Sequence, residues 1–115
     1  MGLEVYEYNG AGYNATMHFE DWRVAMINFG ENFDKPTKMS RHLLTDEVFV
    51  LLEGTATLII GENAEEFPLE KNKIYNVTKA TWHALEVSRD AKVLVVENHN
   101  TCADNSEDMP RPVKK

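Results

Sequence analysis

The feature that most constrains the fold of this chain is its division into short apolar segments separated by turn-forming residues. The segments that predict strands are 3–8, 22–29, 48–52, 55–60, 65–69, 74–77, 82–87 and 93–97. Glycine, proline and asparagine lie between many of them, and no long stretch keeps the 3.6-residue period of a helix. With the segment that carries Ser40, His42 and Leu44 on one face, these make roughly nine strands. Roughly nine strands without a helical crossover favour an all-β fold, a closed barrel or sandwich, over an open parallel sheet.

Length and composition predict one globular domain. The chain has 115 residues, 43% of them hydrophobic, which is enough for a single core and argues against global disorder. After residue 98 the composition becomes polar, and two prolines follow at Pro110 and Pro112. We therefore expect a single domain over residues 1–103 and a C-terminal tail over residues 104–115 that is poorly ordered or lies on the surface.

Charge and cysteine content exclude several classes of function. The formal net charge is −7, so we expect no nucleic-acid partner, because phosphate binding requires a basic face. No apolar run is long enough to span a membrane, and the acidic Glu4 and Glu7 argue against a signal peptide. The single cysteine, Cys102, cannot form an internal disulfide, which fits a reducing compartment. Together these observations predict a cytoplasmic protein.

Strand parity places polar side chains among apolar ones. Residues two apart on a strand share a face, so Glu47 lies on the face of Phe49, and His83 on the face of Leu85. A buried carboxylate is costly unless it is paired or binds a metal. Two imidazoles, those of His42 and His83, and one carboxylate could offset that cost by holding a cation.

The spacing of these residues resembles the first motif of the cupin superfamily. That motif has the form His-x-His, then a glutamate after three or four residues, then a glycine after six more. Here Ser40 stands at the first histidine, and His42, Glu47 and Gly54 follow at matching intervals. Gly54 would permit the positive φ of a tight turn.

A second stretch resembles the end of the second cupin motif. The string Thr81-Trp82-His83-Ala84-Leu85 keeps its histidine, whereas Asn72, Thr78 and Ala80 stand where the family has glycine, proline and glycine. The resemblance covers about residues 24–96. It implies a cupin-type antiparallel β-barrel, also described as a double-stranded β-helix or jelly roll.

The resemblance also implies a metal site. The usual cupin site has three histidines and one glutamate, and the residues left here are His42, Glu47 and His83. Such a set suits Fe(II) with open positions, or zinc with a bound water, and the sequence does not distinguish Fe, Mn, Ni and Zn. Ser40 would bind a metal-bound water or the substrate; the alternative is that its presence marks a site that has lost its metal. Tyr75 is a further pocket candidate, either as a packing aromatic or as a proton-transfer group.

Cupins carry out many activities, so two functional hypotheses stay open. The first is a metal-dependent enzyme, such as an oxygenase or isomerase, acting on a small polar molecule inside the barrel. The alternative is a non-catalytic barrel that binds or senses a small ligand with a degenerate metal site. The resemblance also implies a homodimer, in which residues 3–8 could pair with a neighbour's sheet.

Overall fold

The computed structural model describes residues 2–113, which form two antiparallel five-stranded sheets. The strand order is β1-β2-β9-β4-β7 in the first sheet and β10-β3-β8-β5-β6 in the second. The strands are β1 (Tyr13–Phe19), β2 (Trp22–Asn28), β3 (Lys38–His42), β4 (Glu47–Glu53), β5 (Ala56–Ile60), β6 (Glu65–Pro68), β7 (Tyr75–Val77), β8 (His83–Val87), β9 (Lys92–Asn98) and β10 (Ser106–Pro110). Two short 3-10 turns, η1 (Glu31–Phe33) and η2 (Ala103–Asn105), complete the fold, and the all-β prediction is confirmed.

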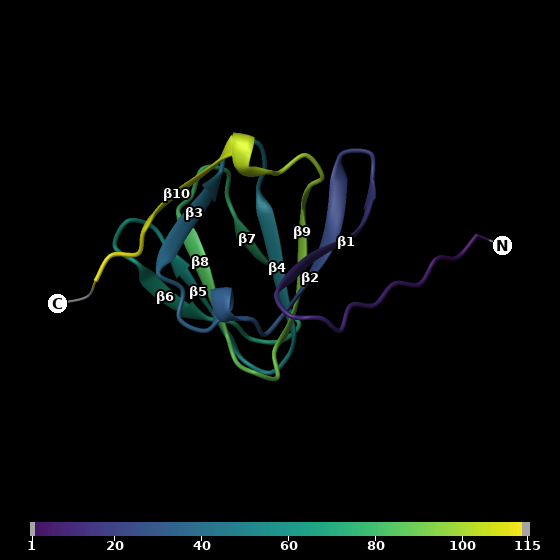
Figure 1. Cartoon of the computed structure of the whole chain (residues 1–115), viewed down its shortest axis with the longest axis horizontal. Helices are drawn as coiled ribbons and strands as arrows, with labels where there is room; N and C mark the ends of the chain where they lie inside the picture. The colour runs from purple at the N-terminus through teal and green to yellow at the C-terminus, as the bar shows by residue number, and fades with distance from the viewer. Residues whose placement is uncertain (1, 114–115) are drawn as a thin grey trace.

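The two sheets face each other and enclose the main core (Figure 1). Alternate residues of the central strands point inward: Phe49 and Leu51 on β4, and Val93 and Val95 on β9, are at most 2% exposed. Leu85 of β8 meets them from the opposite sheet. Because burial alternates along these strands, every second side chain points into the interior.

A smaller apolar cluster covers the opposite face of the second sheet. Met39 and Ile59 are fully buried there. Trp82 and Met109 pack against this cluster, and the guanidinium of Arg41 lies 4.6 Å from the centre of the Trp82 ring. The cluster fixes β3, β5 and β8 from behind, so their inward side chains have a rigid base.

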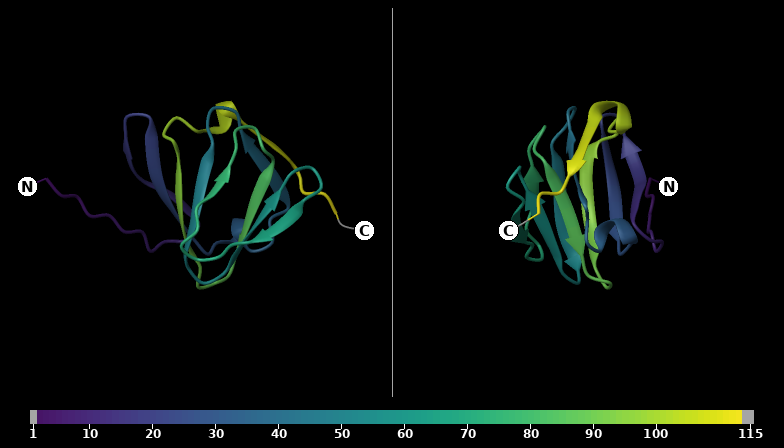
Figure 2. Two further views of the ribbon diagram at one scale, coloured as in Figure 1. Left: turned by 180° about the vertical axis from the view of Figure 1, so that it is seen from behind. Right: turned by 60° about the vertical axis from the view of Figure 1, so that its left-hand side comes forward.

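The N-terminal segment differs from its prediction. Residues 3–8 form no strand, and Leu3 and Val5 are 66% and 84% exposed. Figures 1 and 2 show this segment running away from the barrel. The first strand is instead β1, which pairs with β2 through the turn at Glu20 and Asp21. The strand prediction for residues 3–8 was wrong, because within residues 2–113 this segment pairs with no strand.

The C-terminal segment also differs from its prediction. Within the expected tail, β10 pairs with β3 in a continuous register from Ser106 opposite His42 to Pro110 opposite Lys38. Figure 2 shows β10 descending from η2 along the edge of its sheet. A strand at a sheet edge tolerates polar residues and proline because one side of its backbone needs no partner. The composition of the segment therefore concealed the strand.

Across residues 2–113 the structure contains no helix of the length and apolar character that crossing a bilayer requires.

Candidate metal centre

Three strand ends bring the predicted ligands together inside the barrel. His42 is the last residue of β3, Glu47 the first of β4, and His83 the first of β8. β3 and β8 are neighbours in one sheet, with Ser40 directly opposite His83. β4 belongs to the facing sheet, so its carboxylate reaches the two imidazoles across the interior.

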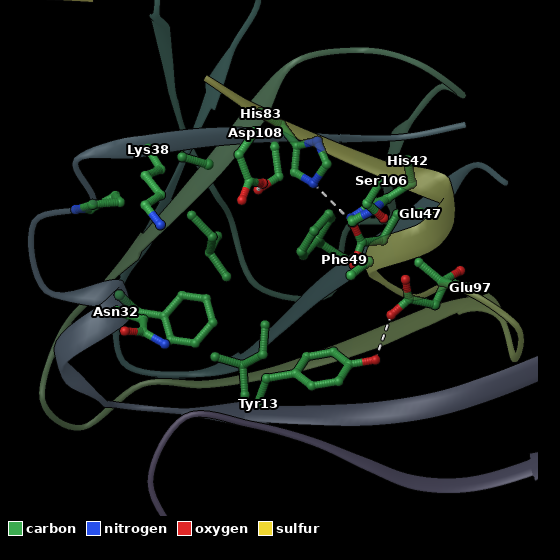
Figure 3. Close-up of a pocket in the computed structure, with 18 of the residues that line it drawn as sticks. Tyr13, Asn32, Lys38, His42, Glu47, Phe49, His83, Glu97, Ser106 and Asp108 are labelled. Atoms are coloured by element: carbon green, nitrogen blue, oxygen red, sulfur yellow. Dashed lines mark hydrogen bonds and ion pairs between the residues drawn. The ribbon is translucent and has the colours of Figure 1, made fainter. Parts of the chain in front are cut away.

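The three side chains converge on one point (Figure 3). Glu47 Oε1 accepts hydrogen bonds from His83 Nε2 at 2.9 Å and from His42 Nε2 at 3.2 Å. One nitrogen or oxygen from each residue lies within 4.8 Å of the others. Glu47 and His83 are only 6% and 7% exposed, and this compact group could hold a metal ion.

Hydrogen bonds on the far side of each imidazole orient the rings. His83 Nδ1 donates to the backbone oxygen of Thr81 at 3.0 Å, and His42 Nδ1 lies 2.8 Å from the Ser106 hydroxyl. A metal-binding histidine usually has such a partner on its second nitrogen, which fixes the tautomer and leaves Nε2 for the metal. The donor set therefore fits a divalent cation in both chemistry and orientation.

The electrostatics of the group favour a charged carboxylate. Burial by itself raises the pKa of the Glu47 carboxyl, but hydrogen bonds from His42 and His83 outweigh burial and lower that pKa to about 2. The hydrogen bond to Glu47 raises the pKa of His42 from its usual value, although burial opposes this. The carboxylate of Glu47 thus favours the protonated form of the His42 imidazole when no metal is bound.

The turns before β7 and before β8 keep the backbone shape that the missing glycines would provide. Asn72 and Ala80 both have positive φ, at 68° and 65°. The Ala80 amide donates to the backbone oxygen of His42 at 2.8 Å, which ties the turn before β8 to β3. Asparagine adopts this region readily, whereas alanine does so at a cost in conformational energy.

The two remaining pocket candidates lie in different places. Ser40 lines the same cavity as the ligands, and its hydroxyl donates to Asp108 Oδ1 of β10 at 2.7 Å. Tyr75 lines a separate, smaller pocket, and its hydroxyl accepts a hydrogen bond from the backbone amide of Glu70 at 2.9 Å. The structure thus places Ser40, but not Tyr75, beside the candidate metal ligands.

The cavity in front of the metal ligands has a volume of about 700 Å³. The same cavity is also lined by Arg23 and by two residues that sequence reasoning did not assign to the site, Tyr13 and Glu97. Glu97 had a usable signal, because it shares the inward face of β9 with Val93 and Val95. Ser106 had none, because its segment carries no strand pattern.

Two facing antiparallel sheets with a His–Glu–His group between them define a small cupin barrel, and solved structures confirm this fold. Pac13 from Streptomyces, solved as a variant with uridine, superimposes with a TM-score of 0.71 over 98% of this chain and 95% of its own, at 10% sequence identity. Pac13 is described as a nucleoside dehydratase.

Two further cupin-type structures are similar. A cupin-2 domain protein from Shewanella frigidimarina has a TM-score of 0.63 and 18% identity over 80% of this chain and 85% of its own. A DMSP lyase structure has a TM-score of 0.55 and 20% identity over 75% of this chain and 43% of its own. No family model and no curated protein sequence matches the chain. The likenesses to solved structures establish the fold alone.

Proposed function

We propose that this chain is a divalent-metal-dependent cupin enzyme that acts on a small polar molecule inside the barrel. The convergence of two imidazole Nε2 atoms on the buried Glu47 carboxylate carries this proposal. His42, Glu47 and His83 would hold the ion. Iron, manganese, nickel and zinc are all compatible with this donor set.

The cavity supports a small-molecule substrate. Its volume of about 700 Å³ lies in the range of ligand sites. When bound, a divalent metal would polarise a substrate oxygen or lower the pKa of a bound water. Pac13, which shares this fold, has been solved with uridine, and this supports a hydroxylated ligand of similar size.

Metal content tests the proposal. We expect untagged protein, purified without chelators and incubated with Fe, Mn, Ni or Zn, to retain close to one ion per chain by mass spectrometry. His42→Ala should abolish retention, whereas His18→Ala, an exposed histidine away from the cavity, should not. Ser40→His should tighten binding. An absence of metal in every loading would contradict the proposal.

A non-catalytic binding barrel is the second candidate, and the environment of Ser40 favours it. The Ser40 hydroxyl is held by Asp108, so it offers no fourth ligand in place of the histidine usual in cupins. Under this alternative, uridine or another small ligand would raise the melting temperature of the chain in the presence of chelator, without turnover. Stabilisation that requires both metal and ligand would favour the enzyme.

We further propose that the protein is a cytoplasmic homodimer. The exposed apolar side chains of residues 3–8, beside two sheets with free outer edges, support strand pairing between copies. The single free cysteine supports a reducing compartment.

A further inference from the structure

A second buried carboxylate, that of Glu97, lies in the same cavity as the candidate metal ligands (Figure 3). It is 5% exposed, and its Oε2 accepts a hydrogen bond from the Tyr13 hydroxyl at 2.5 Å. A buried carboxylate in a ligand cavity is a candidate for chemistry.

Neighbouring strands hold Glu97 in place. Arg23 is its direct cross-strand partner on β2, and Arg23 Nη2 lies 3.4 Å from Glu97 Oε2. The other terminal nitrogen of Arg23 donates to the backbone oxygen of His99 at 3.2 Å. Both contacts to the carboxylate use Oε2, and among residues 2–113 none donates to Oε1. One oxygen is therefore anchored, and the other is free for a ligand.

The surroundings of Glu97 and Tyr13 raise the pKa of both groups. Burial, together with the charge of Glu47, raises the pKa of the Glu97 carboxyl, so it binds a proton more readily than an exposed glutamate. Burial and the contact with Glu97 also raise the pKa of Tyr13, which keeps its hydroxyl protonated. The Tyr13 hydroxyl lies 2.5 Å from Glu97 Oε2, so the carboxylate that accepts a proton and the hydroxyl beside it can pass one between them, as acid–base catalysis requires.

We propose that Glu97 and Tyr13 form the acid–base pair of this cavity, acting on small compounds that carry a carbonyl group next to a C–H bond. This inference rests on the proposed metal-dependent function. Glu97 Oε1 takes the proton from carbon, and the electron pair of the broken C–H bond stays on the ligand as an enolate. Where the next carbon carries a hydroxyl group, the enolate electron pair forms a C=C bond, the C–O bond breaks, and the leaving oxygen takes a proton from Tyr13 and departs as water. The proton held by Glu97 then restores the Tyr13 hydroxyl. This elimination needs no oxidant. Arg23 acts as a positioning residue.

An epoxide probe tests the pair without knowledge of the substrate. Glycidol reacts when a carboxylate oxygen forms a bond to an epoxide carbon, the ring C–O bond breaks, and the released oxygen takes a proton, here from Tyr13. We expect peptide mass spectrometry of the full chain to find the ester on Glu97 at least about tenfold faster than on the exposed Glu53, which serves as an internal reference. Glu97→Gln should remove this label, and Tyr13→Phe should slow it by a similar factor.

Metal content, measured on the same samples, separates the two proposals. Retained metal in Glu97→Gln together with loss of the fast label supports the acid–base pair. Metal in the wild type but no preferential label on Glu97 overturns the pair and leaves the metal centre intact. A fast label on Glu97 in wild-type protein that retains no metal contradicts the proposed metal-dependent function rather than the acid–base pair. Tyr13 is 37% exposed, so Tyr13→Phe should fold even if Glu97→Gln does not; an unchanged label in Tyr13→Phe rules out its role as proton donor.

Discussion

At the scale of single residues, the orientation of His42 depends on a hydroxyl from the last strand. Ser106 Oγ lies 2.8 Å from His42 Nδ1, on the side away from Glu47. We expect Ser106→Ala to weaken metal binding about tenfold, because the ring loses the partner that fixes its tautomer. Titration calorimetry with zinc would measure the loss. Ser106→Thr keeps a hydroxyl and should retain affinity, so equal weakening in both variants would count against this role.

Two ionisable groups of the site tie the stability of the metal-free protein to pH. Glu47 has its pKa lowered from 4.5 to about 2, so its stabilising contribution is present above 4.5 and is lost as the pH falls toward 2. His42 has its pKa raised from 6.5, so its contribution is complete below 6.5 and is lost as the pH rises through the raised value. We expect the melting temperature in chelator to be highest between about 4.5 and 6.5. Glu47→Gln should flatten this profile, and a profile that stays the same would refute the assignment.

The sequence indicated some site residues and concealed others, for physical reasons. Glu47 and His83 could be placed inside because each lies on a strand whose neighbours alternate clearly between apolar and polar. The inward direction of Glu97 was equally visible on β9, but no motif pointed to it. Tyr13 and Ser106 reach the cavity from strands at the edges of the two sheets. Edge strands are partly solvated, so their sequences lack the apolar pattern that reveals buried positions.

At the scale of elements, the turn between β4 and β5 requires glycine for two separate reasons. Gly54 has φ at +72°, and a Cβ there would lie 2.7 Å from the backbone of Ala91. Gly61 has a similar φ of +80° but open space around it. We expect Gly61→Ala to cost about 1 kcal/mol from φ alone, and Gly54→Ala about 3 kcal/mol because a clash is added. Urea unfolding would measure both, and equal losses would show that the contact with Ala91 is unimportant.

Most predicted strands agree with the structure in their bounds. The segments corresponding to β2, β4, β5, β6, β7, β8 and β9 lie within one residue of their expected bounds. Five of them, β2, β4, β5, β8 and β9, are paired on both sides, so burial imposes a strong pattern on them, whereas β6 and β7 lie at sheet edges. β1, which was missed, leads into β2 through Glu20 and Asp21, a turn without the glycine or asparagine that usually marks a hairpin. β10 consists of three polar residues, one methionine and a proline, and its pairing with β3 makes it a strand.

At the scale of the whole molecule, residues 3–7 extend away from the barrel with their apolar side chains exposed (Figure 1). Leu3 and Val5 share one side of the extended chain and are among its most exposed apolar side chains. Tyr8 anchors the base of the segment, where its backbone oxygen accepts a hydrogen bond from the Asn28 side chain at 2.9 Å. An anchored, extended and apolar segment is suited to pairing with the sheet edge of a second copy.

Light scattering at micromolar concentration would test this dimer directly. We expect the wild type to have twice the mass of one chain, and the double variant Leu3→Ser with Val5→Ser to shift toward the monomer, because the apolar area available to a partner is removed. Glu4→Ser is the matched control, since Glu4 lies on the other side of the segment, and it should leave the mass unchanged. Neither variant should melt at a lower temperature than a folded monomer, because the segment contributes nothing to the barrel core. A monomeric wild type, or a dimer that persists in the double variant, would show that the segment takes no part in assembly.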